Sequence, residues 1–258
     1  MKKLVKNSLG FDSNIFVYQD KEMFNYSVDT IMLGNFATMN GSVKRGLDIG
    51  TNNGALSLFI SERKEDLEID AVEIQTKAIK IAKKNIKLNK KRNINLINKD
   101  FNDFYKEHAK NQEQKYDLIV CNPPFYKVDA SQKRKGSEEL YIATHEVKLN
   151  LEQIIMGCAK IIKQKGYLSL VMPTERLIDI FELSRKYGFE PKRIQFIHPR
   201  IYDKSNLVLV ESRFKTGWGP HFLPNIYLHT EDSEEHQYTD FVKKLYKPIK
   251  YKKGAHNE

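Results

Sequence analysis

The sequence predicts an α/β protein with a mostly parallel, doubly wound sheet and one antiparallel strand at its edge. Short runs of Leu, Ile and Val alternate with segments in which apolar residues recur at helical spacing. The runs are almost continuously apolar, which is typical of parallel strands that helices cover on both faces. The first run, Gly46–Gly50, ends in a glycine-containing turn that leads into a helical segment, as in a βα unit.

Five of these runs are expected to form the parallel part of the sheet. They are Gly46–Gly50, Ile69–Glu73, Ile94–Asn98, Asp117–Cys121 and Gly166–Met172. Helices are expected between them at Ala55–Ser61, Thr76–Asn89 and around Leu149–Lys163. In the second helix, Ile79, Ala82 and Ile86 share one face and lysines occupy the others, so the apolar face is expected to cover the sheet.

The C-terminal part of the chain changes in character. Ile194–His198 and Leu207–Glu211 are two strand-like runs with no long helix between them, which favours an antiparallel pair at one edge of the sheet. Residues 129–139 are polar and highly charged, and we expect a mobile loop there. The chain shows no internal repeat and no low-complexity linker, so we expect a single domain over residues 1–258.

The composition indicates a folded protein with an excess of positive charge. Of 258 residues, 40% are hydrophobic, which excludes a disordered chain. The sequence has 43 Lys and Arg against 33 Asp and Glu, a net charge of +10, and such a surplus is typical of proteins that bind nucleic acid. A lysine-rich composition set by a biased genome would give the same surplus, so the charge alone leaves both interpretations open.

Other features of the composition argue against several classes of protein. The two cysteines, Cys121 and Cys158, form no CxxC motif, which fits a reducing compartment and excludes a disulfide framework or a cysteine zinc cluster. No apolar run approaches the ~18 residues of a membrane-spanning helix, and no apolar stretch follows the basic N-terminus as in a secretory signal. We therefore expect a cytoplasmic protein without membrane association and without a metal.

A cofactor turn is indicated by Leu47–Leu58, which has the pattern of a strand, a glycine turn and a helix. Gly50 and Gly54 would let the backbone pass close to a ligand, and the helix that begins near Gly54 offers free N–H groups. Glu73 ends the next strand, where a carboxylate can accept both ribose hydroxyls of an adenosine. Asp100 follows the third strand, within reach of the adenine edge. The GxxxG spacing differs from the GxGxxG of dinucleotide sites, and a tight βα turn with a capping acid is the alternative.

The chemistry is indicated by the tetrapeptide Asn122-Pro123-Pro124-Phe125, which follows an apolar strand directly. Two prolines fix the backbone, so the Pro123 carbonyl points out in a set direction at the end of the sheet where ligands bind. The Asn122 amide oxygen is a second acceptor beside it. Two preset acceptors suit an amino group that must be held and made nucleophilic, and Phe125 offers a face for a planar base. An ordinary Pro-Pro loop is the alternative.

The order LDIGTNNG, Glu73, Asp100 and NPPF resembles the class I S-adenosylmethionine-dependent methyltransferases that modify exocyclic amino groups. The resemblance covers about residues 25–215 and implies a Rossmann-like, seven-stranded sheet, with residues from about 216 to 258 forming a basic C-terminal extension of the same domain. The segment Tyr26–Leu33 resembles the N-terminal cofactor segment of this family. The string CNPPFY and a Thr-His-Glu at 144–146 after a basic loop are similar to the bacterial tRNA1(Val) (adenine37-N6)-methyltransferases.

Two residues depart from that family's pattern. Asn52 stands where glycine is usual, and Phe125 stands where tyrosine is commoner. Asn tolerates left-handed backbone conformations, so we still expect the turn to bind its ligand. NPPF also occurs in the ribosomal guanine-N2 methyltransferases, so the motif alone leaves the identity of the base open.

The resemblance implies a role for each motif residue. S-adenosylmethionine would be bound by Asp48, Gly50, Asn53, Gly54, Glu73, Ile74, Asp100, Phe101 and Asn122, and catalysis would fall to Asn122, Pro123, Pro124 and Phe125. The RNA is expected across a basic face formed by Tyr126, Lys127, Lys133, Arg134, Lys135, Lys243 and Lys244. The partner would be a tRNA, the base adenine 37 and the protein a monomer.

Several other functions remain open at this stage. Guanine-N2 methylation of ribosomal RNA and adenine-N6 methylation of DNA use the same type of site, although DNA enzymes usually carry a target-reading region for which the sequence has little room. Methylation of a protein glutamine amide is disfavoured by the basic surplus. A non-catalytic RNA-binding protein that retains the fold would need neither NPPF nor Glu73.

Overall fold

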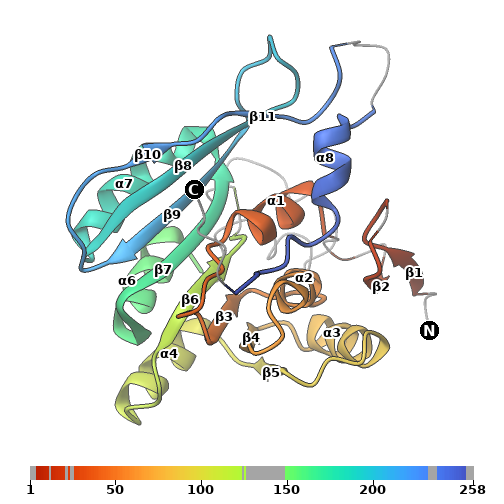
Figure 1. The fold of residues 1–258 in the computed structure, drawn as a ribbon. Helices are drawn as coiled ribbons and strands as arrows, with labels where there is room; N and C mark the ends of the chain where they lie inside the picture. The colour runs from red at the N-terminus through yellow and green to blue at the C-terminus, as the bar shows by residue number, and fades with distance from the viewer. Residues whose placement is uncertain are drawn as a thin grey trace, which may run out of the picture.

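The computed structural model describes residues 4–11, 13–20, 23, 26–123, 125, 149–231 and 237–253. A central sheet runs through the molecule, and helices cover both of its faces (Figure 1). The strands of this sheet are β3 (Arg45–Ile49), β4 (Glu68–Glu73), β5 (Ile94–Asn98), β6 (Tyr116–Cys121), β7 (Ile162–Pro173), β8 (Phe189–His198), β9 (Leu207–Phe214), β10 (His221–Phe222) and β11 (Ile226–Tyr227). Each run that the sequence analysis placed in the sheet lies within or overlaps one of them.

The strand order confirms the expected fold class. From one edge the order is β5-β4-β3-β6-β7-β9-β8, with all neighbours from β5 to β7 parallel and β9 antiparallel to both β7 and β8. Two details differ from the expectation. Within the described residues the sheet has nine strands instead of seven, because β10 and β11 both pair with β8, and two-residue strands are too short to give a sequence pattern. The antiparallel strand β9 is not the edge strand, because β8 pairs with its other side and lies nearer the edge of the sheet.

The helices divide into two layers, each with its own apolar cluster. One layer consists of α1 (Val28–Phe36), α2 (Ala55–Arg63), α3 (Thr76–Leu88) and α8 (Asp240–Leu245). The other consists of α4 (Phe101–Lys110), α6 (Leu151–Ile161) and α7 (Leu177–Lys186). A short 3₁₀ turn, Thr174–Arg176, precedes α7. Alternate strand residues feed the two clusters: Val120 joins the first, and Ile119 and Cys121 join the second. The sheet is therefore doubly wound.

Three of these helices, α1, α4 and α7, were not among those expected from the sequence. α1 is buried along most of its length, at Thr30–Gly34 and Phe36, so it lacks the apolar and polar faces that reveal a surface helix. α4 begins at Phe101, immediately after Asp100, whose carboxylate caps the helix. α7 separates β7 from β8 as a crossover connection.

An N-terminal hairpin, β1 (Val5–Ser8) and β2 (Phe16–Gln19), packs outside the sheet against α3 (Figure 1). Two side-chain amides one turn apart, Asn85 of α3 and Asn89 that caps its C-terminus, bond to the backbone of β2. Asn89 accepts from the Phe16 N–H at 3.0 Å and donates to the Phe16 carbonyl at 2.7 Å. Asn85 is fully buried and does the same for Tyr18, at 2.6 and 3.1 Å. These amides take the place of a third strand.

The C-terminal segment is folded onto the same body. Leu245 and Tyr246 of this segment are buried in the apolar cluster that contains α1 and α2. The Asn35 amide donates to the Leu245 carbonyl at 2.6 Å, and the Arg63 guanidinium donates to the Ile249 carbonyl at 2.9 Å. The lysines of residues 243–253 therefore extend from a packed segment, and their stems lie on the protein surface.

None of the helices in the described ranges is long and apolar enough to cross a membrane. The same ranges hold no group of three or more His, Cys, Asp or Glu side chains placed to bind a metal ion.

Candidate active site

The two sequence motifs meet at one edge of the sheet. β3 and β6 are neighbouring parallel strands, and their register pairs Ile49 with Cys121. Gly50 therefore leaves β3 at the same level at which Asn122 leaves β6. β4 lies on the other side of β3 and ends in Glu73. Because the carboxyl ends of parallel strands share one edge, the glycine turn, the carboxylate and the NPPF tetrapeptide begin side by side.

The turn between β3 and α2 is shaped by left-handed residues. Gly50 has a φ of 70°, Asn52 of 49° and Gly54 of 83°. The Gly50 and Thr51 N–H groups both donate to the Val72 carbonyl, at 2.9 and 3.1 Å. Asn52 adopts the conformation for which the family has glycine, as its side chain permits. The turn therefore has three left-handed residues within five positions, two of them glycines.

The space above Gly50 is open, while the space behind Gly54 is filled. A β-carbon placed on Gly50 would meet no heavy atom within 4 Å among the described residues, but one on Gly54 would lie 3.3 Å from the Ala82 β-carbon. Gly54 therefore lets α2 approach α3, and Gly50 leaves its backbone bare. A bare backbone at a helix-leading turn can approach a ligand closely, which fits an adenosyl cofactor.

Asp48 supports the turn from below. Its carboxylate accepts hydrogen bonds from the Thr51 hydroxyl at 2.7 Å and the Ser57 hydroxyl at 2.6 Å, and its side chain is buried. Burial raises the pKa of Asp48 to about 6, while the two hydroxyls act in the opposite direction. Asp48 is thus placed to fix the loop from inside the protein.

The buried Asp48 carboxylate is expected to make the stability of the protein depend on pH. A carboxyl whose pKa is raised on folding stabilises the protein below its unfolded pKa of 3.8, and this stabilisation is lost as the pH rises through about 6. The loss amounts to about 3 kcal/mol of unfolding free energy, since one pKa unit corresponds to ~1.4 kcal/mol. In denaturant unfolding, Asp48→Asn should therefore gain on the wild type between pH 4 and pH 7. Asp103→Asn, at an exposed position of α4, is the matched control. An equal difference at both pH values would contradict this assignment.

Glu73 is held by the backbone on both sides of it. One carboxylate oxygen accepts from the Asn52 N–H at 3.0 Å and the other from the Gln75 N–H at 2.8 Å. Burial raises the pKa of Glu73, the two N–H groups lower it, and the nearby Asp48 raises it further. Each oxygen retains a lone pair for another donor, so the carboxylate can accept two hydroxyl groups. Ile74, which follows, is 37% exposed and offers an apolar side chain beside it.

Asp100 and Phe101 lie at the start of α4. The Asp100 carboxylate accepts from the Asn102 N–H at 2.7 Å, so one of its oxygens serves as the helix cap. The Phe101 ring is buried and packs against Phe104 and Tyr105. Its ring thus belongs to the core between α4 and α6, and a contact with a cofactor would involve the chain at its backbone.

The NPPF tetrapeptide begins where β6 ends. Asn122 is half-buried and Pro123 is buried, and no hydrogen bond within the described part of the chain uses the Asn122 amide. Phe125 is half-buried against the apolar cluster of α4 and α6, and its carbonyl accepts from the Arg176 guanidinium at 3.5 Å. Pro124 lies outside the described residues. Cys121 is buried and its pKa is raised well above the ordinary value, as expected for a structural thiol.

The basic residues expected to contact RNA are placed only in part. Tyr126, Lys127, Lys133, Arg134 and Lys135 lie outside the described residues, as does the loop expected at residues 129–139. Lys243 and Lys244 lie on α8, where Lys243 pairs with Asp240 at 3.4 Å and Lys244 is exposed. Their contact with RNA stays a prediction.

Several supporting residues were not singled out from the sequence. Thr51 and Ser57 hold Asp48, and the Asn85 amide donates to the Asn53 carbonyl of the turn at 2.9 Å while it also binds the hairpin strand β2. The sequence offers one signal for Asn85, because it is a polar residue on the face of α3 that is otherwise formed by Ile and Ala.

Comparisons with known proteins agree with this geometry. The family model of the methyltransferase small domain matches residues 27–179. A crystal structure of a predicted O-methyltransferase from Agrobacterium tumefaciens superposes with a TM-score of 0.67 at 19% identity, covering 89% of this chain and 100% of that one, which shows the fold. The chain therefore belongs to the methyltransferase small domain family.

Curated relatives narrow the family. The tRNA1(Val) (adenine(37)-N6)-methyltransferase of Tolumonas auensis is 31% identical over 194 residues, 74% of this chain and 77% of the relative. The enzyme of that name from Aliivibrio salmonicida is 28% identical over 227 residues, 85% of this chain and 89% of the relative. This chain belongs to the same family, as the motifs predicted.

Proposed function

We propose that the protein transfers a methyl group from S-adenosylmethionine to the exocyclic N6 of adenine 37 in tRNA1(Val). The family membership supports the reaction, and the names of the relatives support the substrate. The observation that carries the proposal is the register of β3 and β6, which sets the glycine turn and Asn122 at adjacent strand ends. A donor on the turn and an amino group on Asn122 would then lie next to each other.

The residues at this edge fit the methyl donor. The open backbone at Gly50 would face it, Glu73 would accept its two ribose hydroxyls, and the half-exposed Ile74 would contact its adenine. Asp48 and Asn53 would act through the loop, and Asp100 from the α4 cap. S-adenosylmethionine, when bound, supplies a methyl group on a positively charged sulfur.

The NPPF tetrapeptide would position the amino group. The target adenine would leave its stack and place its face against Phe125, with its N6 donating to the Asn122 amide oxygen and the Pro123 carbonyl. These two acceptors direct the nitrogen lone pair away from themselves and stabilise the positive charge that develops on N6. The transfer would break the bond between sulfur and the methyl carbon, leave the donor as a neutral thioether, and leave N6 positively charged until it releases one proton to water. Such a step needs no strong base and no covalent intermediate, which agrees with the burial of Cys121.

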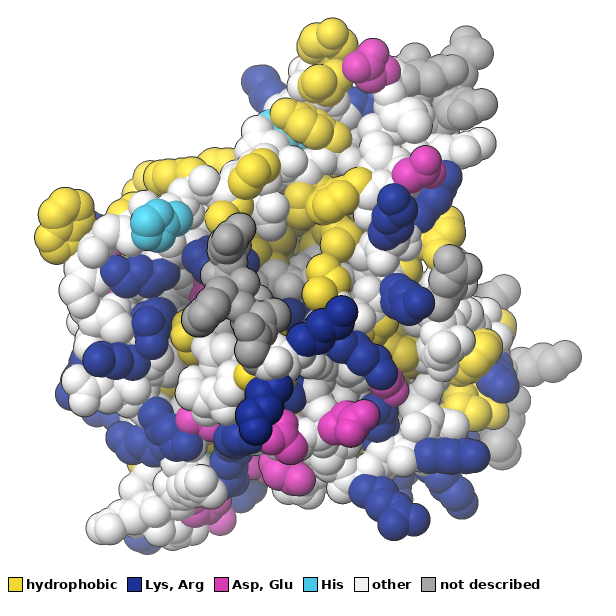
Figure 2. All heavy atoms as spheres, viewed as in Figure 1, with side chains coloured by type: hydrophobic (Ala, Val, Ile, Leu, Met, Phe, Trp, Pro, Cys, Tyr) yellow, Lys and Arg dark blue, Asp and Glu magenta, His cyan; other side chains and the backbone are white. Residues whose placement is uncertain are grey.

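The charge of the surface supports a polyanionic substrate. Figure 2 shows Lys and Arg side chains distributed over one face of the molecule, with fewer acidic side chains among them. We propose that Lys243 and Lys244, together with the basic residues from Tyr126 to Lys135, contact the tRNA backbone, and that the protein acts as a monomer in the cytoplasm.

Incubation of the protein with labelled donor and in vitro transcribed tRNA1(Val), followed by nucleoside analysis, tests the proposal. We expect N6-methyladenosine in the transcript and none when adenine 37 is replaced by guanine. A transcript of another tRNA with adenine at position 37 serves as the control for substrate choice. Recovery of N2-methylguanosine, or of label in neither transcript, would contradict the proposed function.

A further inference from the structure

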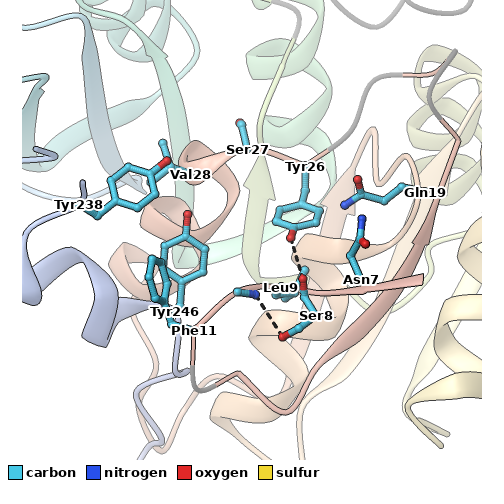
Figure 3. A pocket seen from close by; sticks show the side chains of 11 residues that line it. Asn7, Ser8, Leu9, Phe11, Gln19, Tyr26, Ser27, Val28, Tyr238 and Tyr246 are labelled. Carbon is cyan, nitrogen blue, oxygen red and sulfur yellow. Dashed lines mark hydrogen bonds between the residues drawn. The ribbon is translucent and has the colours of Figure 1, made fainter. Parts of the chain in front are cut away.

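A pocket of about 410 Å³ lies between the N-terminal hairpin and the C-terminal segment. Its walls come from the N-terminal hairpin, the start of α1 and the C-terminal segment around Tyr238 and Tyr246 (Figure 3). The volume is in the range of small-molecule sites. Asn122, Phe125 and the glycine turn are not part of its lining. The adenine being methylated is therefore not assigned to it, and three lining residues, Tyr26, Ser27 and Val28, belong to the Tyr26–Leu33 segment.

Aromatic rings dominate this pocket. Phe11, Tyr238 and Tyr246 form a cluster in which the Phe11 and Tyr246 ring centroids are 4.9 Å apart and the Tyr238 and Tyr246 centroids 6.0 Å apart. Tyr26 lies across from them, and its hydroxyl donates to the Ser8 carbonyl at 3.0 Å, which fixes the position of its ring (Figure 3). Flat rings held in place are the surfaces on which nucleobases stack.

Phe11 has an unusual backbone conformation for an exposed aromatic residue. Its side chain is 51% exposed and its φ is 42°, in the left-handed region that bulky residues rarely adopt. The preceding residue, Gly10, has a φ of 122° and packs against the Tyr246 ring. A β-carbon placed on Gly10 would lie 3.0 Å from an atom of that ring. Strained residues that expose apolar side chains are concentrated at binding sites.

Amide groups stand at the other end of the pocket. Asn7 and Gln19 project from the two hairpin strands toward Tyr26 (Figure 3). The Asn7 side chain is exposed, and no hydrogen bond among the described residues uses its amide. A side-chain amide presents a donor and an acceptor together, which matches the edge of a nucleobase.

The pocket is joined to the methyl-transfer site and to the basic surface. Tyr18 precedes Gln19 in β2, and the buried Asn85 amide connects the Tyr18 backbone to the Asn53 carbonyl of the cofactor turn. On the opposite wall, Tyr246 directly follows α8, which carries Lys243 and Lys244. A polyanion bound along α8 could therefore insert a base here while another base reaches the edge of the sheet.

We propose that this pocket binds a second nucleobase of the substrate RNA, distinct from the adenine that is methylated. This inference rests on the proposed function, because it takes an RNA as the substrate. The exposed Phe11 ring would stack on the base, and the Asn7 and Gln19 amides would bind its edge. The pocket would thus contribute to the choice of RNA through the nucleotides near the target.

Binding measurements on Phe11→Ala and Asn7→Ala test the proposal. Phe11 and Asn7 are exposed, so both variants should fold, as circular dichroism and thermal unfolding would verify. We expect Phe11→Ala to raise the Kd for the tRNA1(Val) transcript by about 5- to 150-fold, the range that stacking on one ring represents. The Kd for S-adenosylmethionine should stay within about twofold. Phe222→Ala, 62% exposed on β10 and outside both the pocket and α8, is the matched control.

A fluorescent base locates the contact. 2-Aminopurine placed at single positions flanking adenine 37 should be quenched by the wild-type protein at one of them, and less by Phe11→Ala. Unchanged tRNA affinity in both variants, with an active wild type, would overturn the pocket proposal alone. A loss of donor affinity instead would assign the pocket to the donor and also overturn it. A wild type that methylates no tRNA contradicts the proposed function, which the separate activity assay reports.

Discussion

Replacing Asn122 by alanine is expected to abolish methyl transfer while S-adenosylmethionine still binds. The substitution removes one of the two acceptors that would hold N6, and loss of one such preorganised group typically reduces turnover by about 10²–10³-fold. The donor would be held mainly by the turn and Glu73, so its Kd should change by less than about threefold. Single-turnover rates with labelled donor and isothermal titration with the donor measure the two quantities separately.

Asn111→Ala is the matched control for this substitution. Asn111 is exposed at the far end of α4, so the same chemical change there should leave both turnover and donor binding unaltered. Turnover of Asn122→Ala within about threefold of the wild type would refute the role assigned to the amide. A parallel loss of donor affinity would place Asn122 in the donor site instead of against the base.

Replacing Glu73 by glutamine is expected to weaken donor binding by about 10²-fold. Glutamine has one acceptor oxygen where the carboxylate has two, and a hydrogen bond to a charged group contributes about 1.5–3 kcal/mol. The backbone N–H of Asn52 or of Gln75 would also lose its partner, which loosens the turn. The buried charge is removed at the same time, so the free energy of unfolding should change by only about 1 kcal/mol.

The glutamine substitution at Glu68 separates these effects. Glu68 lies in the same strand, β4, but at its exposed amino end, away from the carboxyl edge of the sheet. In isothermal titration calorimetry, Glu68→Gln should bind the donor with the same Kd as the wild type. If Glu73→Gln bound the donor with wild-type affinity while remaining folded, the carboxylate would be a structural cap of the loop only.

Most of the sheet could be predicted from the sequence because its strands are apolar on both faces. β5 matches its predicted range, and β3, β4 and β6 lie within one residue of theirs. Elements without such a pattern could not be predicted. α1 is buried on several sides, and β10 and β11 are too short to show a period. The free edge of the β1–β2 hairpin is held by the side-chain amides of Asn85 and Asn89, which lie 67 and 73 residues away in the sequence.

The site residues that could be predicted from the sequence are those that directly follow a strand and whose residue type indicates one chemical role. Glycine at 50, a carboxylate at 73 and asparagine before two prolines each follow a strand, and parallel strands bring their ends together. The roles of Ser57 and Asn85 could not be predicted, since they depend on which helix face meets the turn. The aromatic pocket could not either, because it joins Phe11 and Tyr246 from opposite parts of the chain.

The contact between Gly10 and Tyr246 has a consequence for synthesis of the protein on the ribosome. The helical layer of α1 and α2 is complete only after residues 240–251 are translated, because Asn35 of α1 and Arg63 of α2 donate hydrogen bonds to the backbone of that segment. Until then the nascent chain would leave an apolar face of α1 uncovered, a surface that chaperones recognise and that favours aggregation. A chain that ends near residue 240 is therefore expected to aggregate, although every strand of the sheet would already be present.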